Sequence, residues 1–211
     1  GVQLGQILEH EHQGANALGL TQYGVLPASR DAQAMLREGR AGYLIYGIEP
    51  GLDFADQLIA LKALGGAQVV AFSQFACQST RRVADVILPI GALPEVDAIL
   101  TNLEGRREVA SAAGKLPGQA QPGWRALRAL GGVLGVPGFE FTDLAGLRAG
   151  IAPKAVQVAA GNAPVQSGAG LEIATSQAIY RVDAVTRRAE ALQAHPLNAG
   201  PRMLLNPADA A

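Results

Sequence analysis

Three groups of residues in this sequence have side chains that could do chemistry. The first is the run 9–12 (EHEH), whose imidazoles and carboxylates are of the kinds that bind zinc. Zinc-binding histidines on a helix are spaced four residues apart, whereas these two histidines are two residues apart. We therefore interpret the run as a solvated polar patch, with a metal site as the alternative.

The second candidate is Cys77, the single cysteine of the chain, in the segment 75–80 (FACQST). The neighbouring Arg81 and Arg82 could lower the pKa of its thiol and make it a better nucleophile. No downstream pattern of histidine and asparagine accompanies it, as a thiol enzyme would require. A packing role is therefore the favoured interpretation.

The third group lies in the stretch 84–106 (ADVILPIGALPEVDAILTNLEGR). Its apolar residues 86–88, closed by Pro89, predict a short, buried strand of the parallel type. The stretch ends in a polar cluster of three side chains, Asn102, Glu104 and Arg106. Because α/β proteins place their sites in loops that leave such strands, this segment is a candidate ligand loop.

A strand–helix–strand unit precedes that stretch. The apolar run 43–46 predicts a buried strand, and the turn 47–51 (GIEPG) leads to a helix that we expect Asp53 to cap. A second strand is predicted at 68–73, and the short links indicate that the two strands are parallel. The helix face predicted to cover the sheet consists of Phe54, Leu58, Leu61 and Leu64.

The turn 47–51 could bind a phosphate, but the chain contains neither of the two common glycine fingerprints for nucleotide phosphates. Glu49, within the turn, would also repel an anion. A contact with a ligand hydroxyl group stays open as an alternative. A simple reversal of the chain is the favoured interpretation.

The remaining elements complete an α/β domain over residues 1–150. Trp124 lies on the apolar stripe of a helix that starts at Pro122, and we interpret it as a core anchor. The other elements predicted in this part are helices at 31–40 and 79–83, a hairpin at 99–109 and a short helix from Thr142 to Arg148.

The sequence changes in character after residue 150. Residues 151–177 are rich in Ala, Gly, Gln and Pro, and predict a linker or an irregular crossing. Residues 178–211 are predicted to be the truncated start of a smaller, β-rich domain, so the chain is interpreted as a piece of a longer polypeptide. Its predicted elements are strands at 178–182 and 203–205, with a charged helix or extended arm at 185–193.

Composition excludes several classes of function. The chain has 211 residues with 49% hydrophobic and 17% charged residues, which is typical of a folded protein with a sizeable core. A net charge of −1 and ten aromatic residues argue against a nucleic-acid partner. One cysteine cannot by itself build an iron–sulfur cluster or a zinc site made of cysteines, and it indicates a reducing compartment. We also expect no membrane-spanning segment.

Six stretches occur in an order that resembles a known family. They are GANALG (14–19) with VLP (25–27), YLIYGIEPGLDFAD (43–56), VVAFSQF (69–75), ADVILP (84–89) with Glu95, TNLEGR (101–106) and GQAQPGW (118–124). Together they resemble the molybdopterin-oxidoreductase-type portion of the large iron–sulfur subunit of bacterial NADH-quinone oxidoreductase, respiratory complex I. Residues 179–193 and the ending LLNPADAA (204–211) resemble the C-terminal part of that subunit.

The resemblance implies an α/β fold with a Rossmann-like parallel sheet and flanking helices. It implies a structural part of the peripheral arm, which passes electrons from NADH to quinone, with other peripheral-arm subunits as partners. The iron–sulfur clusters of that subunit belong to an N-terminal region absent here, so no cofactor, metal or catalytic residue is expected in this piece. The implied location is the cytoplasmic side of the bacterial inner membrane, without direct membrane insertion.

The same resemblance points to a relic pocket. In the related molybdenum enzymes, the corresponding strand-end loops border a pterin-guanine nucleotide. Bulky Ile99 and Leu100 replace residues nearer Gly and Phe, and the run 78–81 (QSTR) replaces Thr-Glu-Thr-Ala, which suggests a filled pocket. The positions of this chain that match the border are Glu49, Ser73, Asp85, Asn102 and Arg106.

Two other functions compete with the structural role. One is that of a fragment of an oxidoreductase that depends on molybdopterin-guanine dinucleotide, similar to formate dehydrogenase. The other is that of a free-standing Rossmann-like nucleotide-binding domain, which the missing glycine fingerprint disfavours.

Overall fold

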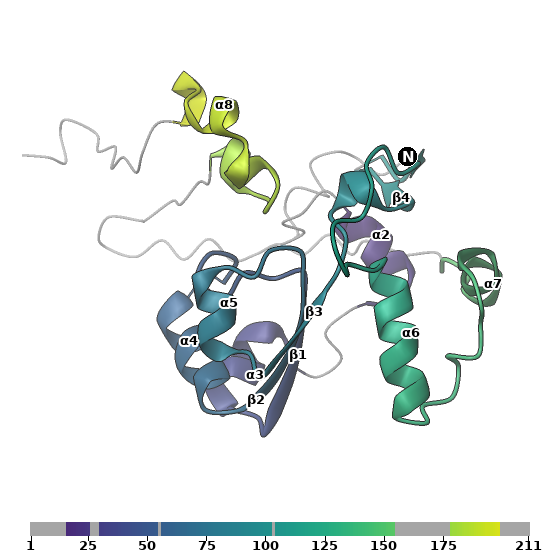
Figure 1. Ribbon diagram of the computed structural model, residues 1–211, viewed down its shortest axis with the longest axis horizontal. Helices are drawn as coiled ribbons and strands as arrows, with labels where there is room; N and C mark the ends of the chain where they lie inside the picture. The colour runs from purple at the N-terminus through teal and green to yellow at the C-terminus, as the bar shows by residue number, and fades with distance from the viewer. Residues whose placement is uncertain (1–15, 26–29, 55, 103, 155–177, 199–211) are drawn as a thin grey trace, which may run out of the picture. The chain divides into compact units, whose positions relative to one another are not determined.

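The computed structural model describes residues 16–25, 30–54, 56–102, 104–154 and 178–198 (Figure 1). The chain divides into two compact units, residues 1–163 and residues 164–211. Each unit is described by itself. The predicted polar patch at 9–12, most of the expected linker and the expected strand at 203–205 lie outside the described residues.

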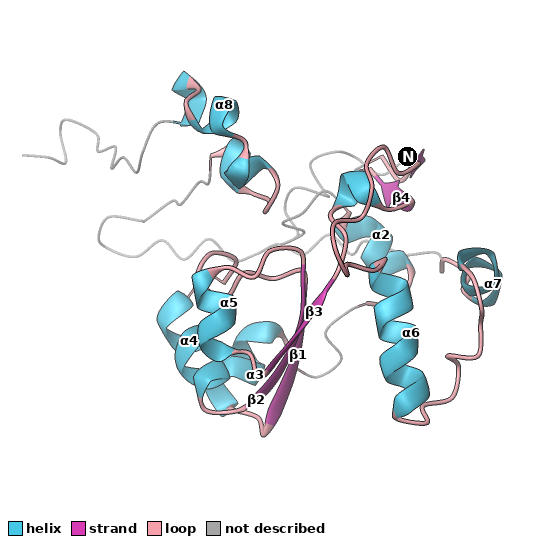
Figure 2. Cartoon of the chain, viewed as in Figure 1, coloured by secondary structure: helices cyan, strands magenta, loops and turns pink. Residues whose placement is uncertain are grey.

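The first unit is built on a three-stranded parallel sheet (Figure 2). Its strands are β1 (Gly42–Tyr46), β2 (Gln68–Ser73) and β3 (Val86–Pro89), in the order β1-β2-β3. The register places Tyr46 beside Phe72 and Phe72 beside Leu88. The predicted parallel strands and the α/β fold class are confirmed.

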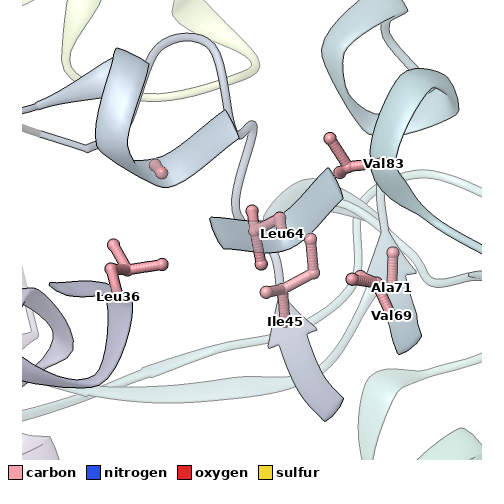
Figure 3. Close-up of a cluster of buried hydrophobic side chains, with 7 residues drawn as sticks. Leu36, Ile45, Leu64, Val69, Ala71 and Val83 are labelled. Atoms are coloured by element: carbon pink, nitrogen blue, oxygen red, sulfur yellow. The ribbon is translucent and has the colours of Figure 1, made fainter. Parts of the chain in front are cut away.

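Three helices cover one face of this sheet (Figure 1). They are α3 (Ala32–Glu38), α4 (Gln57–Gly65) and α5 (Gln78–Val83). Their apolar side chains meet alternate residues of β1 and β2, because successive residues of a strand point to opposite faces. The resulting core consists of Leu36, Ile45, Ala60, Leu64, Val69, Ala71 and Val83 (Figure 3).

The opposite face of the sheet carries apolar side chains that stay partly exposed. Leu44 and Tyr46 of β1 are exposed, and Val86 of β3 keeps 47% of its surface accessible. The prediction of a buried strand at 86–88 is therefore wrong in burial, although the strand and its parallel pairing are present. Within the described chain, β3 is an edge strand, which explains the exposure.

Helix α4 begins later than the sequence predicted. Asp56, rather than Asp53, caps it by accepting a hydrogen bond from the backbone N–H of Ile59 at 2.9 Å. Ala60 and Leu64 of this helix lie in the core, whereas Leu58 is 82% exposed. The predicted apolar face was therefore wrong at Leu58.

The rest of the first unit contains a hairpin and further helices. Strands β4 (Ala98–Thr101) and β5 (Arg107–Ala110) pair antiparallel, as predicted. The short helix after residue 142 is present, but Asp143 caps it instead of Thr142. The helices of this part are α2 (Ala17–Gln22), the 3₁₀ turn η1 (Leu93–Glu95), α6 (Gly123–Val133) and α7 (Leu144–Gly150).

Helix α6 agrees with its prediction. Pro122 precedes it, and Gly135 adopts a positive φ of 64° just after it ends, a conformation that favours glycine. Trp124 is half-buried and its ring centroid lies 6.1 Å from that of Phe141. Trp124 of α6 thus packs in an aromatic cluster with Phe139 and Phe141, which follow the helix. This packing is consistent with an anchoring role.

The described part of the second unit consists of short helical turns. They are η2 (Ile179–Arg181), η3 (Thr186–Arg188), α8 (Glu190–Gln193) and η4 (Pro196–Asn198). The predicted strand at 178–182 is wrong, because the Gln193 amide donates to the carbonyls of Tyr180 and Thr186 at 2.9 and 2.8 Å and holds a turn there. The helical alternative for 185–193 is confirmed in η3 and α8.

Candidate functional site

The carboxyl edge of the parallel sheet is where an α/β protein places a ligand. Two of the five predicted pocket residues lie there, Glu49 after β1 and Ser73 at the end of β2. They are 2% and 5% exposed. The Ser73 hydroxyl donates to the carbonyl of Phe75 at 2.8 Å, so it serves the local turn.

Five backbone amides of the turn 47–51 and the two residues after it donate hydrogen bonds within the protein. An anion site at such a turn requires several N–H groups that converge on open space. The donors and acceptors are Gly47 to the Phe72 carbonyl (2.8 Å), Glu49 to the Asp53 carboxylate (2.6 Å), Gly51 to the Ser79 hydroxyl (3.0 Å), and Leu52 and Asp53 to the Glu49 carbonyl (2.9 and 3.0 Å). These five amides are therefore engaged within the fold.

The loop that follows β3 also has backbone amides that donate hydrogen bonds within the protein. The N–H groups of Ile90 and Gly91 donate to the carbonyls of Ser73 and Gln121 at 3.1 and 3.0 Å. The Glu95 carboxylate accepts from the N–H of Ala92 at 2.8 Å, so Glu95 also has a local structural role. The described residues of this edge do not fit the pyrophosphate of a pterin-guanine nucleotide, which needs free donors and no buried carboxylate such as that of Glu49.

Cys77 lies at the same edge, before the first residue of α5. The hydroxyl oxygens of Ser79 and Thr80 each lie 3.2 Å from its sulfur atom. Partial burial works to raise the pKa of the thiol, but hydrogen bonds from Ser79 and Thr80 outweigh it, so the pKa lies below its ordinary value. Arg81, which the sequence suggested as the cause, instead donates from Nε to the Ala76 carbonyl at 2.7 Å.

This geometry makes the reactivity of Cys77 testable. The rate of alkylation by iodoacetamide should rise with pH around a midpoint below that of a free cysteine, because the thiolate is the nucleophile. Thr80→Val removes one hydroxyl donor and is expected to move that midpoint to higher pH. The rate–pH profile of the folded chain gives the measurement, and the urea-unfolded chain is the control. An unchanged midpoint in Thr80→Val would contradict the assignment.

Asp85 lies at the other end of the sheet, between α5 and β3. Its carboxylate accepts from the N–H of Val69 at 2.7 Å, and its own N–H donates to the Val69 carbonyl at 2.9 Å. Asp85 therefore joins the amino ends of β2 and β3. The structure separates it from Glu49 and Ser73.

We expect Asp85→Ala to lower the free energy of unfolding by about 1–3 kcal/mol, because the Val69 amide loses its partner. Asp85→Asn keeps an oxygen acceptor and should cost clearly less. Urea denaturation of both variants and the parent chain checks the pair. Equal losses in the two variants would argue against the hydrogen bond as the cause.

Asn102 and Arg106 lie in the turn between β4 and β5. The Asn102 side-chain oxygen accepts from the N–H groups of Glu104 and Arg106 at 3.0 and 2.9 Å, and so closes the turn. Exposed Arg106 forms an ion pair with Glu108, with Nε 3.0 Å from the carboxylate. The contacts described for Asn102 and Arg106 therefore lie within the hairpin and stabilise it.

Ile99 and Leu100 are successive residues of β4 and therefore point to opposite faces of the hairpin. Ile99 is opposite Val109 and Leu100 is opposite Glu108, and both are half-buried. The two side chains therefore cannot fill the same pocket. The expectation that Ile99 and Leu100 together fill the relic pocket is corrected accordingly.

The sequence analysis missed the side chains that form hydrogen bonds to these loops. Asp53 was expected to cap a helix, although an acid four residues after Glu49 can also reach back to the turn. Ser79 and Thr80 stood out only as a departure from a family pattern. Hydroxyl residues two and three positions after a cysteine are the signal that could have found the thiol environment.

The described part of the chain shows neither a metal cluster nor a membrane span. No group of three or more His, Cys, Asp or Glu side chains there could hold a metal ion. None of the helices described is long and apolar enough to span a bilayer.

Comparison with known proteins assigns the family. The sequence model of the molybdopterin oxidoreductase family matches residues 5–133, which is more than half of the chain. The chain belongs to the molybdopterin oxidoreductase family. This assignment agrees with the parallel sheet and flanking helices, and it confirms the resemblance found in the six stretches.

A curated relative is consistent with this membership. The chain is 40% identical over 67 residues to the mitochondrial NADH-ubiquinone oxidoreductase 78 kDa subunit of Neurospora crassa. The match covers 32% of this chain and 9% of the relative. The chain is thus similar to a small part of this relative, which is much longer than the chain.

Proposed function

We propose that this chain is a piece of the large iron–sulfur subunit of NADH-quinone oxidoreductase, respiratory complex I, and that it is a structural part of the peripheral arm. The observation that carries this proposal is the 40% identity to a subunit of NADH-ubiquinone oxidoreductase. The partners would be other peripheral-arm subunits, at the cytoplasmic side of the membrane. The catalytic chemistry would lie elsewhere in the complex.

The proposal includes the expectation that this piece binds no cofactor of its own. The engaged amides of the turn 47–51 support it, because a nucleotide pyrophosphate would find no free donors among them. The buried carboxylate of Glu49 supports it as well. The local structural roles of Asp85 and Asn102 remove two further candidate ligands.

The family match favours a second candidate, a fragment of a molybdenum oxidoreductase. Metal analysis of the purified full-length subunit for molybdenum, with an ultraviolet scan of the extract for pterin and guanine, separates the two. We expect iron and sulfide from the N-terminal clusters but no stoichiometric molybdenum or pterin. One molybdenum per chain would contradict the structural role.

Association gives the positive test. Affinity-tagged full-length subunit, expressed in its own cells, should co-purify with the other peripheral-arm subunits and with NADH-oxidising activity. A full-length variant with Leu64→Asp, which disrupts the core of this piece, should lose that association while keeping its N-terminal clusters. Failure of the parent subunit to co-purify with the arm would contradict the proposal.

A further inference from the structure

A groove lies between α3 and α4, on the side of these helices away from the carboxyl edge described above. It has a volume of 410 Å³ and runs past the end of α3 along the last turns of α4. The floor is apolar and consists of Leu36, which is buried, and of half-buried Ile59 and Ala63. None of these features belongs to the predicted relic pocket.

The rim of the groove is basic. Arg37, Arg40 and Lys62 line it, against a single acidic residue, Glu38. The Glu38 carboxylate is already paired, because Arg30 and Arg40 donate to it at 2.7 and 2.6 Å. The hydrogen bond from Arg30 lowers its pKa most, so this carboxylate stays ionised and bound to its arginines.

The lining of this groove carries a net positive charge. Three cations (Arg37, Arg40 and Lys62) against one carboxylate (Glu38) give +2, whereas the whole chain has a net charge of −1. Lys62 projects from the exposed side of α4, one residue before Ala63 of the floor. Cationic side chains beside apolar floor residues match a ligand that combines carboxylates with an apolar stripe.

We propose that the groove between α3 and α4 binds an acidic amphipathic helix of a partner protein. Two neighbouring helices form a trough in which a third helix can lie, with apolar residues spaced three and four positions apart toward the floor. Glutamates that flank this stripe would meet Arg37 and Lys62, since Arg40 is already paired with Glu38. The inference stands on this groove alone and does not depend on the assignment to complex I.

A peptide titration with the 211-residue chain tests the proposal. The probe is a fluorescein-labelled helical peptide of about 20 residues, with a leucine stripe flanked by glutamates. We expect a Kd on the order of 10–100 µM at low salt, weakening at least about tenfold at high salt. Two control peptides carry lysine in place of every glutamate or serine in place of every leucine, and neither should bind.

Variants locate the effect. Lys62→Glu is expected to weaken binding of the acidic peptide by about tenfold or more, and Lys62→Gln by less. Arg148→Glu makes the same change of charge in α7, at an exposed residue outside the groove, and should leave the affinity unchanged. Circular dichroism melting shows that each variant is folded.

Carbodiimide crosslinking gives an independent readout, because it joins carboxylates directly to lysines in contact. The chain has three lysines, Lys62, Lys115 and Lys154, so the crosslinked position is readily assigned by mass spectrometry. The proposal requires crosslinks concentrated at Lys62. Equal crosslinking at all three lysines would overturn it, as would absence of peptide binding, or binding of inorganic phosphate or anionic vesicles in place of the peptide.

Discussion

Leu64→Ala is expected to lower the free energy of unfolding of the first unit by about 2–5 kcal/mol. Leu64 is 0% exposed and is one of the two fully enclosed residues that α4 contributes to the core on the sheet. Truncation removes apolar contacts and leaves a cavity that close-packed neighbours fill only partly. Chemical denaturation followed by circular dichroism measures the loss.

Leu58→Ala on the same helix is the matched control. It removes the same atoms from a side chain that is 82% exposed, so the change should stay within about 0.5 kcal/mol. The contrast between the two leucines tests which face of α4 packs on the sheet. Similar losses at both positions would show that Leu58 is buried as well, as the sequence analysis predicted.

Gly131→Ala in α6 is expected to lower the free energy of unfolding by about 1–3 kcal/mol. The loss should come from the aromatic cluster of Trp124, Phe139 and Phe141. A Cβ atom at Gly131 would lie on the ring of Phe139, within 2.6 Å of both its Cδ atoms. These atoms belong to the body of the ring, so a small rotation of the side chain cannot remove the clash. The melting temperature and the near-ultraviolet signal of Trp124 should both change.

The adjacent Gly132 provides the control. A Cβ there meets nothing within 4 Å, and alanine is the better helix former. Gly132→Ala should therefore stabilise the chain by about 0.5–1 kcal/mol. Adding Phe139→Ala to Gly131→Ala should remove the steric part of the loss, and a lack of such coupling would place the cause elsewhere.

The sequence predicted strands and turns well where the signal was local. The apolar runs at 43–46 and 68–73 end at glycine or polar residues, and both became strands at nearly the predicted bounds. Glu104-Gly105 specified the turn of the hairpin because Gly105 adopts a φ of 81°. Such signals need no knowledge of the rest of the fold.

Errors arose where two residues could do the same task. Asp53 and Asp56 are both residues of the type that caps a helix. Asp53 accepts from the backbone N–H of Glu49 instead, so Asp56 is the residue that caps α4. No local rule ranks these options. Leu58 is exposed for a separate reason, because the face that meets the sheet centres on Ala60 and Leu64, and Leu58 lies about 120° from Leu64 around the helix.

The candidate site residues do not all lie together, for a different reason. The five candidate residues were grouped because they match one pocket of related enzymes, yet spatial grouping depends on which end of a strand each residue occupies. Asp85 precedes β3 and Ser73 ends β2, so the two lie at opposite edges of the sheet. Likewise, the burial of Val86 depended on whether anything covers the second face of the sheet.

The hydrogen bonding of the turn 47–51 has a consequence for how the turn keeps its shape. Amides that are paired within the protein hold a loop in one conformation without a ligand. Here the strands, Asp53 and Ser79 supply the partners. The conformation of this turn is therefore tied to β2, Asp53 and Ser79, so loss of any one of these partners should loosen the carboxyl edge of the sheet.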